Sequence, residues 1–331
     1  MSKGKEESFA VGGQAVIEGV MMRAKDYIAC AVRNPEGKIV LTREPFQSFL
    51  VRIKLHKVPI LRGAIGLVET MYVGMRMLTY SAEIAMPEEA TKRKGWREKF
   101  SMAFTMIAAF GLGLLLFFYV PLLLTDLVPG TEGSMAFNLV DGFFRLVIFL
   151  LYIWLISLWK DMRRVFEYHG AEHKTINCYE SGAPMTPESI KASPRLHPRC
   201  GTSFLLLVMI VSIVVFIFTG RPETVGDRLM RLAFVPLIGG ISYELIKLSG
   251  KAKWRYWLAP LVYPGLWLQL ITTKEADLDQ CEVALTSLAA CLDPDEAAER
   301  IPGFAEMNLS GELESEEEPE AGEVSEGETP V

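Results

Sequence analysis

The stretch SMAFTMIAAFGLGLLLFFYVPLLLTDLV, residues 101–128, decides the fold class, because Asp126 is its only charged residue. A helix needs about 20 predominantly apolar residues to cross the hydrocarbon core of a bilayer. Three later stretches are of the same kind, at residues 139–160, 202–220 and 229–249. The sequence therefore predicts an α-helical polytopic membrane protein with about four transmembrane helices, in a membrane domain over residues 101–272.

Two other apolar stretches are less suited to crossing a bilayer. Residues 59–87 carry charges at intervals of seven residues: Arg62, Glu69, Arg76 and Glu83. Burying these four charges in lipid would cost on the order of 10 kcal/mol, so we expect an amphipathic helix at the interface or packed on the bundle. Residues 256–272 are short and contain two prolines among Trp and Tyr. They predict a re-entrant or interfacial segment, or else a fifth span.

The distribution of basic residues predicts the orientation of the chain in the membrane. Residues 91–100 and the loop 161–200 are rich in Lys and Arg, whereas residues 129–138 between the first two spans have none. Short loops rich in Lys and Arg stay on the cytoplasmic side, so we expect a multi-pass protein with its N-terminus in the cytoplasm. Four spans also place the C-terminus there. The net charge of −6 gives no reason to expect a nucleic-acid partner.

The remaining segments are predicted to be cytoplasmic. Residues 1–58 form a small β-rich region, in which YIACAVR and KIVLTR flank the turn NPEG and predict a hairpin, and the preceding GGQAVIEGVMMR is expected to add a strand. Residues 273–308 have the apolar spacing of a cytoplasmic surface helix. Residues 309–331 are rich in Glu with no Lys or Arg, which predicts a disordered acidic tail. The cysteines are odd in number and form no CxxC pair, so reduced thiols are expected.

The stretch YHGAEHKTINCYE, residues 168–180, contains two of the four histidines. The second span has no breaker after Trp159 until Gly182, so its helix is expected to continue into the cytoplasm. On such a helix His169 and His173 are separated by about 40° of rotation and 6 Å of rise, which lets both imidazoles reach one ion. With Glu172 they form the order H-x-x-E-H, in which two histidines hold Zn²⁺ and the carboxylate takes a proton from water.

A second motif, His197-x-x-Cys200, stands directly before the third span. Its spacing suits two ligands from one loop, and it falls at the same predicted cytoplasmic edge as the histidine pair. Four protein ligands would make a closed, structural site, and three with an open position would make a catalytic one. Histidines that only make hydrogen bonds at the interface are the alternative. At the end of the fourth span, Glu244 is either a functional carboxylate or the i, i+3 ion-pair partner of Lys247.

Four strings in order, GGQAVIEGVMMR, YHGAEHKTINCYE, LHPRCGTSF and YPGLWLQLITTKEADLDQCEVAL, resemble the YqhQ-like family of bacterial membrane proteins. The resemblance covers roughly residues 9 to 292. It implies a protein of the bacterial inner membrane, described only as a predicted metal-dependent enzyme. Carried onto this chain, that description rests on the motif residues His169, Glu172, His173, His197 and Cys200.

These observations support three hypotheses. The first is a membrane metal-dependent hydrolase with zinc on His169, His173, and His197 or Cys200, and with Glu172 as general base. Its substrate would be a membrane-bound peptide or lipid-linked ester. The chain lacks the large soluble domain of inverzincin peptidases, which argues against a peptidase. The second is a non-enzymatic assembly or scaffold protein with a structural metal or polar site. A transporter is ranked third, below these two, because the spans contain few ionisable residues and no visible internal repeat.

Overall fold

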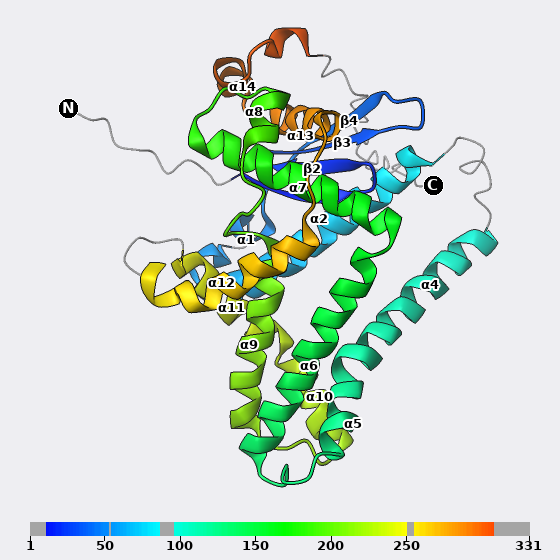
Figure 1. The fold of residues 1–331 in the computed structure, drawn as a ribbon, viewed down its shortest axis with the longest axis vertical. Helices are drawn as coiled ribbons and strands as arrows, with labels where there is room; N and C mark the ends of the chain where they lie inside the picture. The colour runs from blue at the N-terminus through cyan, green and yellow to red at the C-terminus, as the bar shows by residue number, and fades with distance from the viewer. Residues whose placement is uncertain (1–10, 53, 87–95, 250–254, 308–331) are drawn as a thin grey trace, which may run out of the picture.

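The computed structural model describes residues 11–52, 54–86, 96–249 and 255–307. Figure 1 shows two layers, a bundle of long apolar helices below and a sheet covered by helices above. The chain is mostly helical, has four helices long and apolar enough to cross a membrane, and has a four-stranded antiparallel sheet near its N-terminus. This confirms the predicted fold class at that level. The expected acidic tail lies outside the described residues.

The four apolar helical segments are Phe104–Asp126, Ser134–Ser157, Gly201–Thr219 and Val225–Ser249. The first consists of α4 (Trp96–Leu114), a π-helical turn (Leu115–Tyr119) and α5 (Val120–Asp126). Pro121 follows the π turn and has no N–H, which accounts for the local change in hydrogen bonding. The second and third are α6 (Ser134–Ser157) and α9 (Gly201–Thr219), and the fourth is α10 (Val225–Ala233) joined to α11 (Val235–Ser249).

The expected continuation of the second span is wrong. Helix α6 ends at Ser157, Trp159 is extended, and α7 (Lys160–Ser181) starts in a new direction across the upper layer (Figure 1). No sequence breaker marks this point, so the break reflects tertiary packing, because ten residues of α7 are buried in the upper layer. The predicted loop 161–200 is therefore largely helical, with α8 (Pro187–Ala192) following α7.

The sheet is a meander of β1 (Gly12–Val16), β2 (Gly19–Arg23), β3 (Tyr27–Arg33) and β4 (Ile39–Pro45), paired in chain order. The predicted hairpin is β3–β4, and its turn is held by the Asn34 side chain, which accepts from the backbone N–H groups of Glu36 and Lys38. The preceding string supplies two strands instead of one. Alternate residues face opposite sides, so that one face of the sheet packs on α7 and α13 and the other on α2.

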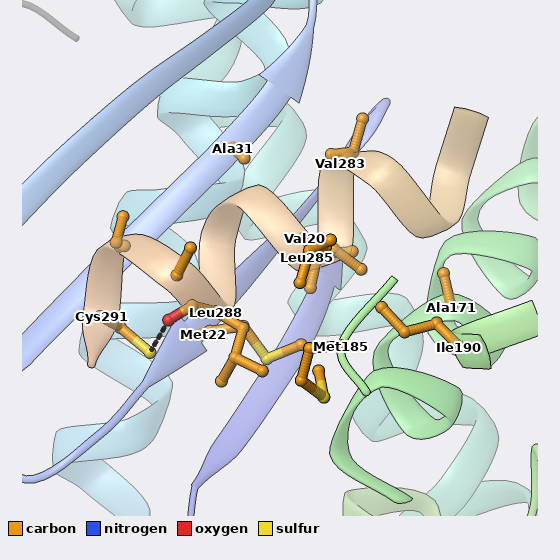
Figure 2. Close-up of a cluster of buried hydrophobic side chains, with 14 of the residues drawn as sticks. Val20, Met22, Ala31, Ala171, Met185, Ile190, Val283, Leu285, Leu288 and Cys291 are labelled. Atoms are coloured by element: carbon orange, nitrogen blue, oxygen red, sulfur yellow. Dashed lines mark hydrogen bonds between the residues drawn. The ribbon is translucent and has the colours of Figure 1, made fainter. Parts of the chain in front are cut away.

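Helix α13 (Leu278–Cys291) is the centre of the upper layer, so its predicted surface position is wrong. Every residue from Val283 to Cys291 is buried, and Figure 2 shows Leu288 beside Met22 of β2. The polar residues in the buried part of α13 are small, so the sheet, α7 and α8 can pack on it from several sides. One of them, Ser287, donates its hydroxyl to the Ala29 carbonyl at 3.0 Å. The predicted range 273–308 also contains α14 (Pro294–Arg300) and a short 3-10 turn at Phe304–Glu306.

Helix α2 (Leu61–Ala85) crosses between the two layers and packs on α11 and on the sheet (Figure 1). Its predicted charged face is satisfied by protein partners. Arg62 binds Glu244 at 2.7 Å, Arg76 pairs with Glu44, and Glu69 accepts from the backbone N–H of Phe49, where α1 (Phe49–Arg52) begins. The ion pair of Glu244 is therefore made with α2 and not with Lys247.

Helix α12 (Arg255–Thr272) covers the segment expected to be re-entrant, interfacial or spanning. It is helical throughout although it contains Pro260 and Pro264, and it runs across the upper end of α9 (Figure 1). The two helices approach closely where Gly265 meets Ser203, because a Cβ at Gly265 would lie 2.6 Å from that side chain. This contact carries the C-terminal end of α12 toward α7.

Candidate metal centre

The centre forms where α7 meets the residues that follow α12. A Cβ on Gly170 would lie 2.0 Å from the Lys274 carbonyl oxygen, so only glycine permits this approach. The Lys274 N–H in turn donates to the Phe166 carbonyl at 2.8 Å. This backbone contact places Thr272 next to His169.

The two histidines of α7 are fixed by backbone carbonyls. His169 Nδ1 lies 2.8 Å from the Thr272 oxygen, and His173 Nδ1 lies 2.6 Å from the Arg195 oxygen. Because a carbonyl oxygen can only accept, each Nδ1 carries the proton, and in the neutral ring each Nε2 is left with a lone pair. The ring centroids are 4.5 Å apart, which confirms that the i, i+4 spacing puts both imidazoles on one face.

Cys200 brings a third donor atom to the pair. It is the N-cap residue of α9, where its Sγ accepts from the Thr202 N–H at 3.4 Å, and the same Sγ lies 3.3 Å from His169 Nε2. One ligand atom each from His169, His173 and Cys200 lies within 4.8 Å of the other two. Residues from two separate motifs therefore meet in space, which the sequence alone could not establish.

This donor set fits a zinc-like ion. Two imidazole nitrogens and a thiolate are preferred ligands of zinc, and each histidine donates its other N–H to a carbonyl, as metal-binding histidines do. Ligands bound at 2.0–2.3 Å lie about 3.5 Å apart in a tetrahedral site. The separation of Cys200 Sγ from His169 Nε2, 3.3 Å, is close to this value, and all three atoms lie within 4.8 Å of one another.

Glu172 lies beside the donor set in a buried position. It is 5% exposed, and its Oε2 is 3.5 Å from His173 Nε2. Burial raises the pKa of the Glu172 carboxyl above its ordinary value, opposed by His169, His197 and the backbone N–H of Gly13, which donates to it. A Cβ on Gly13 would lie 2.8 Å from Glu172 Cγ, so strand β1 is pressed against this side chain.

His197 is near the group but outside it. Its ring centroid is 5.9 Å from that of His173, its Nδ1 accepts from the Arg199 N–H at 3.4 Å, and its Nε2 faces Glu180 at 3.5 Å. Burial lowers the pKa of His197. In this arrangement Nε2 carries the proton, so His197 would have to change tautomer and turn to become a fourth ligand. Its role as a ligand stays a prediction.

Several residues that shape the centre were not singled out by the sequence motifs. Gln269 fixes the loop of His197, accepting from its N–H at 2.9 Å and donating to its carbonyl at 2.8 Å. Gly13, Gly170 and Thr272 act through backbone atoms or through the absence of a side chain. All four lie within the strings that carried the family resemblance, which was the one available signal for them.

The fold and the cluster define a helical protein with four helices able to cross a membrane and a histidine–cysteine group beside a buried glutamate. The chain belongs to the family described as Protein of unknown function (DUF1385), whose model matches residues 58–294. It is similar to the Uncharacterized protein YqhQ of Bacillus subtilis (strain 168), with 35% identity over 309 residues that cover 90% of this chain and 95% of the relative. These matches confirm the YqhQ-like resemblance. No solved structure matches.

Proposed function

We propose that this protein is an integral membrane, metal-dependent hydrolase that acts at the cytoplasmic face of a bacterial cytoplasmic membrane. One observation carries the proposal: His169, His173 and Cys200 each have a ligand atom within 4.8 Å of the other two, and both imidazoles are fixed by carbonyls. Two imidazole nitrogens and a cysteine sulfur are ligand types that suit a divalent cation of the zinc kind. We take zinc as the ion.

The zinc ion and the residues of the chain have separate roles in the proposed reaction. A bound zinc ion would supply a Lewis acid and lower the pKa of water. Glu172 accepts the proton at its carboxylate, and burial raises the pKa of this group, which makes it a stronger base. The Gly13 N–H holds the carboxylate in place beside the histidines.

The neighbouring surface favours a lipid-linked substrate over a peptide. A cleft of about 730 Å³ includes Gly13 in its lining, together with Arg23 and Arg52. It shares Phe46 with an apolar groove of about 740 Å³ along α2. Two arginines beside an apolar groove suit an anionic headgroup on a hydrocarbon chain. Among the residues that line the cleft, Gly13 contacts Glu172.

The first experiment measures the metal content of the full chain, purified in detergent without a histidine tag, by elemental mass spectrometry. We expect about one zinc per chain. The Glu172→Gln variant should retain the metal and lose hydrolysis of anionic lipid esters by about 100-fold or more. Glu167→Gln, five residues earlier on α7, is the matched control and should retain both. Unchanged turnover in Glu172→Gln would exclude the general-base role.

A scaffold with a structural metal is the second candidate. It is favoured by the fact that the cluster connects three separate segments, namely α7, the Arg195–Cys200 segment and the end of α12 at Thr272. On this reading Glu172→Gln is tolerated in a complementation assay, whereas His173→Ala loses metal and lowers the unfolding temperature. Failure of Glu172→Gln to complement, with metal and stability intact, favours the enzyme.

A further inference from the structure

Three charged side chains lie buried among the apolar helices, away from the candidate metal centre. Asp141 and Arg145 are one turn apart on α6, and Arg231 belongs to α10. Asp141 and Arg231 are each 2% exposed and Arg145 is 8% exposed. Asp141 and Arg145 lie about 10 to 16 Å along α6 from its first residue, Ser134. The last residue of α6 leads to α7 and the metal centre, at the other end of the helix.

One carboxylate serves both guanidinium groups. Arg145 Nη2 donates to Asp141 Oδ2 at 2.9 Å, and Arg231 Nη1 lies 3.7 Å from the same oxygen. Arg231 also donates through Nη2 to Asn138 Oδ1 and to the Gly220 carbonyl, each at 2.6 Å. Both of these partners are neutral, so the buried triad has a formal charge of +1.

Among the described residues, the nearby charged groups offset this excess only in part: Asp227 acts electrostatically on Arg231. Asp227 is exposed, and its carboxylate caps α10 by accepting from the N–H groups of Glu223 and Thr224. Arg221 pairs with Asp126 at 2.9 Å, and Arg228 adds a further positive charge. The ring of Phe216 lies 4.9 Å from the Arg231 guanidinium carbon and 5.4 Å from that of Arg145, a contact that carries no countercharge.

The triad also leaves hydrogen-bond donors unused. Arg145 Nε and Arg231 Nη1 are buried and have no hydrogen-bond partner among the described residues, and the acceptor Asp141 Oδ1 is also unpaired there. Arginine does not release its proton in proteins, so the excess charge cannot be removed by titration. An uncompensated buried charge is strongly destabilising, and two unpaired donors add to that cost.

We propose that the triad is a binding site for a small monovalent anion, such as chloride, held between Arg145 and Arg231. The anion neutralises the excess charge and accepts from the two unused guanidinium N–H groups. Asp141 keeps the arginines in place and limits the site to one negative charge. The burial of all three side chains excludes large anions. This site is independent of the proposed hydrolase chemistry.

The test measures the unfolding temperature of the full chain in detergent by tryptophan fluorescence. Sodium chloride replaces sodium gluconate at constant ionic strength, so the cation and the ionic strength stay the same while a small anion replaces a large one. We expect the unfolding temperature to rise with chloride and to saturate. The same temperature at every chloride fraction would overturn the proposal.

Two variants locate the effect. Arg145→Gln leaves a neutral Asp141–Arg231 pair and should abolish the chloride-dependent rise. Asp141→Asn raises the site charge to +2 and should lower the half-saturating chloride concentration several-fold. Arg163→Gln, an exposed arginine on α7, is the control and should behave as the parent protein. An unchanged chloride response in both Arg145→Gln and Asp141→Asn would place the anion elsewhere and refute the site.

Discussion

At the scale of single residues, the candidate centre depends on backbone atoms as much as on ligands. The carbonyls of Thr272 and Arg195 select the tautomers of His169 and His173, so the Nε2 atoms of both rings carry the lone pairs that the proposed ion would use. Preorganisation of this kind reduces the entropy lost when the ion is captured. The sequence motifs identified the imidazoles, but a carbonyl has no residue type that a motif could reveal.

Gly170 provides a test of that arrangement. The Gly170→Ala change would put a methyl group against the Lys274 carbonyl, a backbone atom that cannot turn away. We expect the free energy of unfolding to fall by about 3 kcal/mol and the metal content to fall with it, because Thr272 would move away from His169. Both are measured in detergent, the first by denaturant titration.

The control for this change is Gly111→Ala in α4. A Cβ at Gly111 meets nothing within 4 Å in the described part of the chain, so the variant should be neutral or stabilising by about 0.5–1 kcal/mol. If Gly170→Ala were as stable as the control and retained its metal, the close approach of the two backbones would not be needed to form the centre.

At the scale of elements, α2 joins the sheet to the apolar helices through charges that the sequence placed at intervals of seven. Arg62 and Glu244 are both largely buried, with side chains 21% and 18% exposed. We expect a coupling energy of about 1 kcal/mol from a double-mutant cycle with Arg62→Met and Glu244→Gln. The exposed pair Lys38–Glu36 should give a value near zero. Equal coupling in the two pairs would mean that α2 is not held to α11 by this contact.

The elements also show how far sequence reasoning reaches. The four apolar helices and the β3–β4 hairpin were predictable because each depends on a local sequence pattern: the length of an apolar run for the helices, and β-rich runs around turn residues for the hairpin. The break at Trp159 and the central position of α13 were not, because both follow from packing between segments distant in sequence. Similarly, His169 and His173 were paired correctly by helical spacing, whereas the separation of His197 from the group depends on Gln269 and Glu180.

At the scale of the whole molecule, the two layers imply an orientation in the membrane that can be measured. The helices able to cross a bilayer share one layer, and the sheet, α7 and α13 form the other (Figure 1). The segment 129–133 lies between α5 and α6, at the end of the bundle far from the sheet (Figure 1), and it contains no basic residue. By the positive-inside rule we expect the sheet layer to face the cytoplasm.

We therefore expect a cysteine introduced at Glu132 to react with a membrane-impermeant maleimide in intact cells, and one at exposed Arg163 to react only after the membrane is opened. The five native cysteines are buried, so the parent protein gives the background signal. Both positions are exposed on the folded chain, which makes their labelling comparable. Labelling of Arg163→Cys from outside, with Glu132→Cys protected, would reverse the orientation and move the candidate metal centre to the outer face. Labelling of both from outside would contradict a crossing of α6 between them.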